Sequence, residues 1–140
     1  MPNSDNLARN KELVRRICRH LSARDLPAMF ELIHDEGSWS IPYREDRFQF
    51  AGFRTKPQLR EMLEGFLGIF ESFQFEISNM TAEDDRVVIE AKSQGVGPGG
   101  VACGNIYVLV FFIKDGKAHT VREYFDPFQA LAFVEQLPAA

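Results

Sequence analysis

Hydrophobic residues recur at helical spacing through the first half of the chain, and this periodicity predicts three helices. The first covers about residues 6–23, and a short second helix follows Asp25, whose carboxylate can cap it. The third begins at Thr55, because Thr55 and Gln58 have the spacing of a capping box. The apolar stripe of the first helix consists of Leu7, Val14, Ile17, Cys18 and Leu21.

The hydrophobic period changes to two in the second half, which predicts strands over 73–78, 86–93, 101–114 and 117–125. Asp115-Gly116 lies between two apolar runs and is a strong signal for a type I′ hairpin. A short strand is expected earlier, over 38–43, and a last helix from Asp126 to about Leu137. Helices followed by an antiparallel meander indicate an α+β domain with the helices on one face of a curved antiparallel sheet.

Composition narrows the function classes. The 140 residues fit one domain over 1–140, and 16 basic against 20 acidic residues leave a net charge of −4. No nucleic-acid partner is expected, because that class usually presents a basic face. The polar start lacks a signal-peptide pattern and no apolar run is long enough for a membrane span, so a cytoplasmic protein without a membrane partner is expected. Thirteen phenylalanines indicate a large hydrophobic core or an apolar cavity.

Metal and cofactor chemistry is not expected. Cys18 and Cys103 lie among apolar neighbours, and the three histidines share no ligand spacing with them or with each other. The glycine-rich stretch 95–100 lacks the Lys-Ser/Thr ending of a phosphate-binding loop. We therefore predict neither a metal nor a cofactor.

A two-residue turn at Asp115-Gly116 also predicts which side chains share a face of the last hairpin, with Leu109 opposite Arg122 and Tyr107 opposite Tyr124. One face would be apolar near the turn, where Phe111 lies, and polar at its far end. The converging polar residues would be Asn105, Tyr107, Arg122, Tyr124 and Asp126. An apolar cavity with a few polar groups is typical of a small-molecule binding site. An ion pair between Arg122 and a carboxylate is the alternative.

The opposite face would carry mainly aliphatic residues, with Glu123 as its charged member and His119 near the turn. Both faces are then too apolar for a sheet with one side in water. Helices can cover only one of them. We therefore predict a homodimer through the outer face of the sheet.

The runs 105–112, 115–117 and 122–126 resemble the SnoaL-like polyketide cyclase family. This family belongs to a superfamily with ketosteroid isomerase, limonene epoxide hydrolase and the nuclear transport factor fold. The similarity covers about residues 8–137 and implies a cone-shaped domain with an internal cavity. It implies fold more than activity, since this superfamily contains enzymes and plain binding modules.

The resemblance also implies site residues. Asp126 occupies a place similar to the family's acid/base residue, and Arg122 with Tyr124 resembles its Arg-Glu-Tyr signature. Glu90 resembles an acidic position that often faces the cavity, while Trp39 and Tyr43 share a strand face near the expected mouth. No tyrosine precedes Tyr43, so the first-helix tyrosine of ketosteroid isomerase has no counterpart.

Two of these residues have competing roles. Asp126 precedes Pro127 and can cap the last helix, with Gln129 completing a capping box. Glu90 would be the better base if it were buried among Val88 and Phe75, or it could neutralise an arginine. The alternatives for the whole protein are a cofactor-free isomerase or cyclase acting on an apolar cyclic or polyketide-like substrate, a non-catalytic ligand-binding or dimerisation module, and, third, an epoxide hydrolase-like enzyme.

Overall fold

The computed structural model describes residues 4–138, which form four α-helices, one 3₁₀ turn and a six-stranded sheet. The helices are α1 (Ser4–Ala23), α2 (Leu26–Glu31), α3 (Lys56–Gly68) and α4 (Pro127–Gln136), and the 3₁₀ turn is η1 (Pro98–Gly100). The strands are β1 (Ile33–Ile41), β2 (Gly52–Thr55), β3 (Ser72–Glu83), β4 (Arg86–Val96), β5 (Ala102–Lys114) and β6 (Lys117–Phe125).

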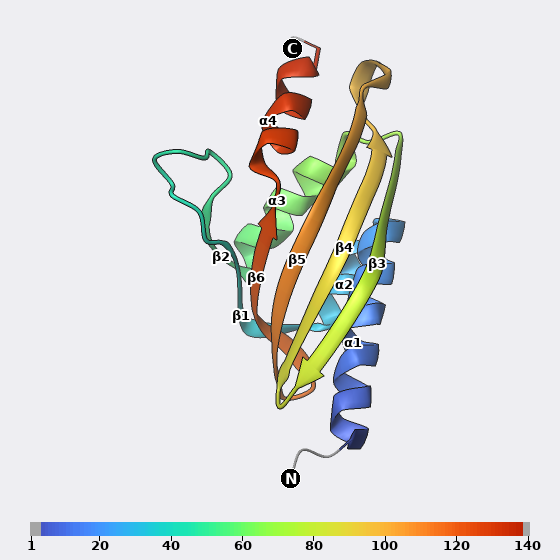
Figure 1. Cartoon of the computed structure of the whole chain (residues 1–140), viewed down its shortest axis with the longest axis vertical. Helices are drawn as coiled ribbons and strands as arrows, with labels where there is room; N and C mark the ends of the chain where they lie inside the picture. The colour runs from blue at the N-terminus through green and yellow to red at the C-terminus, as the bar shows by residue number, and fades with distance from the viewer. Residues whose placement is uncertain (1–3, 139–140) are drawn as a thin grey trace.

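The strand order in the sheet is β2-β1-β6-β5-β4-β3 (Figure 1). The α+β class with helices on a curved sheet is confirmed, but the sheet is mixed because β1 pairs with β6 in parallel. The other neighbouring pairs are antiparallel. The chain passes through α3 before it enters the meander β3–β6. The last strand of this meander, β6, lies beside β1 in place of the first strand, β3, and runs in the same direction as β1.

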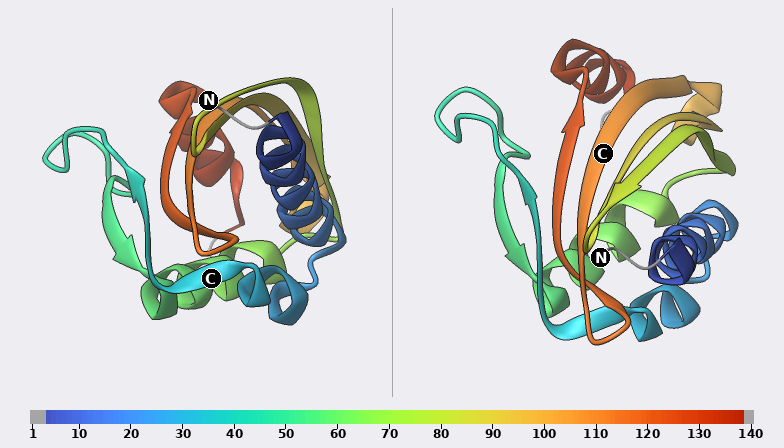
Figure 2. Two further views of the ribbon diagram at one scale, coloured as in Figure 1. Left: turned by 90° about the horizontal axis from the view of Figure 1, so that it is seen from below. Right: turned by 60° about the horizontal axis from the view of Figure 1, so that its bottom comes forward.

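The helices α1, α2 and α3 lie on one side of the sheet, which curves around them (Figure 2). We call this side the inner face. In Figure 1 the opposite, outer face of β3–β6 is turned toward the viewer, and none of the described helices crosses it. The predicted arrangement of helices on one face is therefore confirmed.

Local signals in the sequence predicted the helix starts and the hairpin well. Asp25 accepts a hydrogen bond from the Ala28 N–H at 3.3 Å, and Thr55 forms the full capping box of α3. At the β5–β6 turn, Asp115 has φ +54° and Gly116 has φ +72°, the positive values that a type I′ turn requires. These signals depend only on neighbouring residues, so they can be predicted without knowing how distant segments pack.

Strand boundaries were predicted less well. β1 begins at Ile33, five residues before the predicted start at residue 38, and β2 directly precedes α3, where no strand was predicted. Both differences come from pairing with distant strands, since Ile33 pairs with Ala118 and Ser38 pairs with Thr55. Local periodicity does not carry that information.

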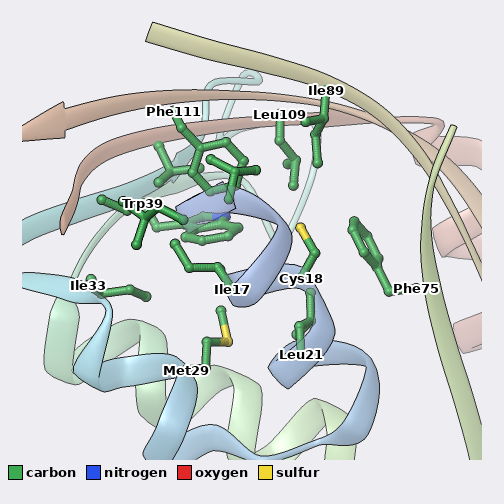
Figure 3. Packing of buried hydrophobic residues seen from close by; sticks show 14 of the residues in the cluster. Ile17, Cys18, Leu21, Met29, Ile33, Trp39, Phe75, Ile89, Leu109 and Phe111 are labelled. Atoms are coloured by element: carbon green, nitrogen blue, oxygen red, sulfur yellow. The ribbon is translucent and has the colours of Figure 1, made fainter. Parts of the chain in front are cut away.

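The core lies between α1, α2 and the inner face of the sheet (Figure 3). Figure 3 shows Ile17 and Cys18 of α1 lying beneath Leu109 and Phe111 of β5. The stripe predicted for α1 is buried at four of its five positions; Leu13 is buried and Leu7 only partly. None of the helices in the described part of the chain is long and apolar enough to cross a membrane.

Two irregularities in the sheet meet beside the β5–β6 turn. On β6, Ala118 pairs with Ile113 but Thr120 pairs with Phe112, so His119 is one extra residue, a β-bulge. On β1 the register to β6 shifts between Ile33 and Ser38. Gly37 makes this close approach possible, because an added Cβ would lie 2.8 Å from the His34 carbonyl oxygen and 3.0 Å from that of His119.

Candidate functional site

The bulge at His119 decides which side chains of β6 point inward. Side chains alternate with period two, so one extra residue exchanges the two faces of the strand beyond it. Glu123 therefore pairs with Leu109, and Phe125 with Tyr107, on the inner face. The predicted pairing of Leu109 with Arg122 and of Tyr107 with Tyr124 was wrong for this reason.

Glu123 is the charged residue that the bulge turns inward. Its Oε1 accepts a hydrogen bond from the Trp39 indole Nε1 at 2.8 Å. Burial raises the pKa of the Glu123 carboxyl, while the Trp39 hydrogen bond and the charge of Arg54 act in the lowering direction without cancelling the rise. A carboxyl with a raised pKa can deliver or accept a proton near neutral pH.

The Tyr107 hydroxyl is the second polar group of the site. Its Oη lies 2.8 Å from the Oγ of Ser93, the buried polar residue of β4. Burial raises the pKa of the Tyr107 hydroxyl above its usual range, so it stays protonated. When Ser93 donates to Tyr107, the phenolic proton is free for a hydrogen bond to a ligand oxygen.

Both groups line one partly open, apolar cavity of about 50 Å³ between the inner face of the sheet and the helices. Its wall is formed by Leu21, Met29, Trp39, Leu63, Phe66, Leu67, Phe73, Phe75, Tyr107, Leu109 and Glu123. The volume holds a few water molecules at most, since one water needs about 10–15 Å³ of such space. A larger ligand therefore requires the wall to move. Phe66, with 39% of its surface exposed, is the most accessible part of that wall.

Replacing Glu123 with glutamine should change stability in a pH-dependent way. The folded pKa of Glu123 lies above its ordinary value of 4.5, so its stabilising contribution is complete below pH 4.5 and is lost as pH rises through the folded pKa. Glutamine can keep the Trp39 hydrogen bond and never ionises. We expect Glu123→Gln to gain about 1–3 kcal/mol over the wild type between acidic and alkaline pH.

Urea unfolding of both proteins between pH 4 and 9 measures this difference. The matched control is Glu61→Gln, which changes the same chemical group at an exposed position of α3 and should change the free energy of unfolding by less than about 0.5 kcal/mol. A Glu123→Gln difference that stays constant over the whole range would contradict the buried, ionisable carboxyl.

Arg122 and Tyr124 lie on the outer face, away from the cavity. The guanidinium carbon of Arg122 lies 4.9 Å from the ring centroid of Phe112, and its Nε is buried without a hydrogen-bond partner. Tyr124 pairs with Val108 and is 39% exposed. Their expected convergence with Tyr107 does not occur, because the bulge moves both to the other side of β6.

Glu90 also faces outward. Its neighbours Ile89 and Ala91 are buried on the inner face, and the alternation of β4 exposes Glu90 between them. Its Oε1 accepts a hydrogen bond from the Asn79 side-chain amide at 3.1 Å. The condition for Glu90 to serve as a base, burial among apolar residues, is therefore not met.

Asp126 is the N-cap of α4, where its carboxylate accepts a hydrogen bond from the Phe128 N–H at 2.9 Å, with no reciprocal bond from Gln129. The Asn105 side chain donates to the Asp126 carbonyl oxygen and accepts from its N–H, both at 3.0 Å. Tyr43 is similarly occupied, since its hydroxyl exchanges 2.5 Å hydrogen bonds with the backbone of Phe125. These three residues lie outside the cavity wall, and their polar groups tie the ends of β5, β6 and β1 together.

Trp39 and Phe111 lie on the predicted inner face. Trp39 is part of the cavity wall, and Phe111 is fully buried behind it, with the two rings edge to face at 6.0 Å. Glu123 and Ser93 were missed as site residues. The signal for Glu123 was the single acidic residue in the predicted strand 117–125, but its face was predicted from an unbroken hairpin register. Nothing in the sequence singled out Ser93.

Comparison with known proteins decides the family. Residues 14–130 match the family model described as "SnoaL-like domain". This protein belongs to that family. The resemblance noted in the sequence is thereby confirmed.

One relative and two solved structures show how far the similarity extends. "UPF0523 protein C" of Dictyostelium discoideum is 30% identical over 107 residues, which cover 71% of this chain but only 65% of the relative. The structure of TerC co-crystallised with polyporic acid is 18% identical, covering 91% of this chain and 99% of that one with a TM-score of 0.79.

A protein of ketosteroid isomerase-like fold from Catenulispora acidiphila, solved in complex with trimethylamine, is 16% identical, with a TM-score of 0.74. The match covers 91% of this chain and 94% of the Catenulispora acidiphila chain. At this level of identity the two structures establish the shared cone fold and leave the activity open.

Proposed function

We propose that this SnoaL-like protein binds a small, mainly apolar molecule in the inner cavity and transfers a proton on it without a cofactor, as an isomerase or cyclase does. The observation that carries the proposal is the buried Glu123 carboxyl, held by Trp39 in the wall of an apolar cavity. A buried acid with a raised pKa beside a neutral hydrogen-bond donor is a common arrangement for general acid–base chemistry.

In this reaction the Glu123 carboxylate accepts a proton from the carbon next to a substrate carbonyl. The electron pair of that C–H bond forms a C=C bond to the carbonyl carbon, the π pair of the C=O bond moves to the oxygen, and the resulting enolate oxygen accepts a hydrogen bond from the Tyr107 hydroxyl. In an isomerisation the protonated Glu123 returns the proton to a different carbon of the conjugated enolate, and the C=O bond forms again. In a cyclisation the enolate carbon forms a C–C bond to a second carbonyl carbon of the substrate, the π pair of that carbonyl moves to its oxygen, and Glu123 delivers the proton to this oxygen. Trp39 positions the carboxyl throughout through its Nε1–H.

A non-catalytic binding module is the second candidate, and the small free volume of about 50 Å³ favours it. An epoxide hydrolase needs a further acid beside the first to hold and activate water, and Glu123 is the single carboxylate among the residues that line the cavity in the described chain. The two solved structures of this fold that hold polyporic acid and trimethylamine support a small-molecule ligand for either remaining candidate.

Hydrogen–deuterium exchange tests the proposal before the substrate is known. A panel of cyclic ketones and β-dicarbonyl compounds is incubated with the protein in D₂O, and deuterium at the carbon next to the carbonyl is followed by NMR. Protein-dependent exchange supports proton transfer. A ligand that shifts the Trp39 indole resonance without any exchange across the panel would leave the binding module as the function.

We also propose that a second copy of this chain covers the outer face of the sheet. Ile106 is 66% exposed and Val108 is 38% exposed there. Arg122 and Glu90 carry opposite charges on the strands to either side of β5. A two-fold axis through β5 would bring Arg122 of one copy toward Glu90 of the other and give the buried Arg122 Nε an acceptor.

Sedimentation equilibrium at micromolar concentration measures the mass directly. A dimer of the 16.0 kDa chain is expected for the wild type, and Val108→Lys should shift it toward the monomer. A monomeric wild type at that concentration would exclude this dimer.

A further inference from the structure

We infer that Arg54 is a further ligand-binding residue, which anchors an anionic oxygen of the substrate beside Glu123. This inference rests on the proposed function and adds a substrate class to it: a mainly apolar carbonyl compound that carries a carboxylate or an acidic enol. Sequence analysis did not single out Arg54.

The position of Arg54 follows from the register of the edge hairpin. Arg54 of β2 is the cross-strand partner of Trp39 of β1, and cross-strand partners share a face of the sheet. Its side chain therefore lies on the inner face, on the same side as the indole that holds Glu123. The positive charge of Arg54 acts to lower the pKa of Glu123 against the larger effect of burial, which agrees with this placement.

The hydrogen bonding of the guanidinium is incomplete. Its Nη2 donates to the Phe50 carbonyl oxygen at 2.9 Å, while Nη1 is buried and has no hydrogen-bond partner. Among the described residues, no carboxylate forms an ion pair with Arg54. The ion pairs that do form lie mostly between exposed side chains at the surface. A buried, unpaired charged donor is costly unless something absent from the folded chain accepts from it.

An anionic oxygen is the acceptor that fits this donor best. Guanidinium groups bind carboxylates through strong, charge-assisted hydrogen bonds, and Nη1 is the remaining buried donor. Glu123 does not take this role in the structure, because its Oε1 accepts from Trp39 and it forms no ion pair or hydrogen bond with Arg54. The site thus combines one group that exchanges a proton with one permanent positive charge.

Phenylacetate and its neutral analogue phenylacetamide are suitable probes. Both are titrated into the ¹⁵N-labelled protein, and binding is followed at the indole N–H resonance of Trp39, the single tryptophan of the chain. We expect the wild type to bind phenylacetate at least about tenfold more tightly than phenylacetamide, and Arg54→Gln to lose this preference. Arg54→Lys should keep part of this preference, because lysine keeps the positive charge but lacks the paired N–H donors of the guanidinium.

Arg47→Gln is the matched control. Arg47 lies on the β1–β2 connection that precedes the strand of Arg54, is exposed and contacts Asp46 at the surface, so this variant should keep the preference. Equal binding of both probes by the wild type, no shift with either probe, or the same loss in Arg47→Gln as in Arg54→Gln would each overturn the inference. The Lys variant keeps the test valid if the Gln variant does not fold.

The outcome is separable from that of the proton-transfer proposal. A protein that prefers phenylacetate through Arg54 but exchanges no proton in D₂O keeps the anion site and loses the catalytic role. A protein that exchanges protons through Glu123 without any preference for phenylacetate keeps the catalytic role and loses the anion site.

Discussion

Glu123→Gln should slow protein-dependent proton exchange by about 100- to 10,000-fold, the usual contribution of a positioned general acid or base. The amide has nearly the same shape and can still accept the hydrogen bond from Trp39, so the cavity should keep its form. What is removed is the group that accepts the proton. Exchange rates in D₂O at several pH values, with the responsive ketone from the panel, measure the effect.

Two further variants make this result specific. Glu90→Gln removes a carboxylate from the exposed side of β4 and should leave the exchange rate unchanged. Tyr107→Phe removes the hydroxyl that would stabilise the enolate and should slow exchange less than loss of the base does, while binding is retained. Exchange that persists at the wild-type rate in Glu123→Gln would disprove the assigned role.

Phe111→Ala should lower the free energy of unfolding by about 3–5 kcal/mol. Phe111 is fully buried on the inner face of β5, and its ring contacts the edge of the Trp39 ring. The alanine variant loses the burial of the ring and leaves a cavity that the surrounding strands cannot close. Urea unfolding monitored by circular dichroism measures the change.

The control for this experiment is Phe128→Ala. Phe128 is 80% exposed at the start of α4, so the same substitution should change the free energy of unfolding by less than about 0.5 kcal/mol. A small effect at Phe111 would mean that the core relaxes around the lost ring. It would also mean that Trp39 does not depend on Phe111 for its position.

The errors in the predicted site have one physical origin. The turn at Asp115-Gly116 was predicted correctly, and so was the inner face of β5, on which Tyr107 and Phe111 lie. The transfer of that register to β6 failed after His119, because a single extra residue reverses the side-chain alternation. Trp39 and Tyr107 are cavity residues in the structure, whereas Arg122 and Glu90 face outward.

The sequence by itself determined the elements whose signals are local. The helix caps at Asp25 and Thr55, the type I′ turn and the period-two strands all depend on residues a few positions apart. The caps and the turn formed as predicted, and the strands formed with shifted boundaries. These elements, with the order in which they follow one another, were enough to indicate the α+β class. The resemblance to the SnoaL-like family came from the runs 105–112, 115–117 and 122–126.

Only the tertiary structure decided which acid faces the cavity. The bulge at His119 forms beside an irregularity of β1, a strand that lies more than 80 residues earlier and pairs with β6 in parallel. Gly37 permits the contact between them, since its missing Cβ leaves room for two carbonyl oxygens. Because this packing joins distant segments, the inward position of Glu123 is a property of the assembled sheet and has no local signature in the chain.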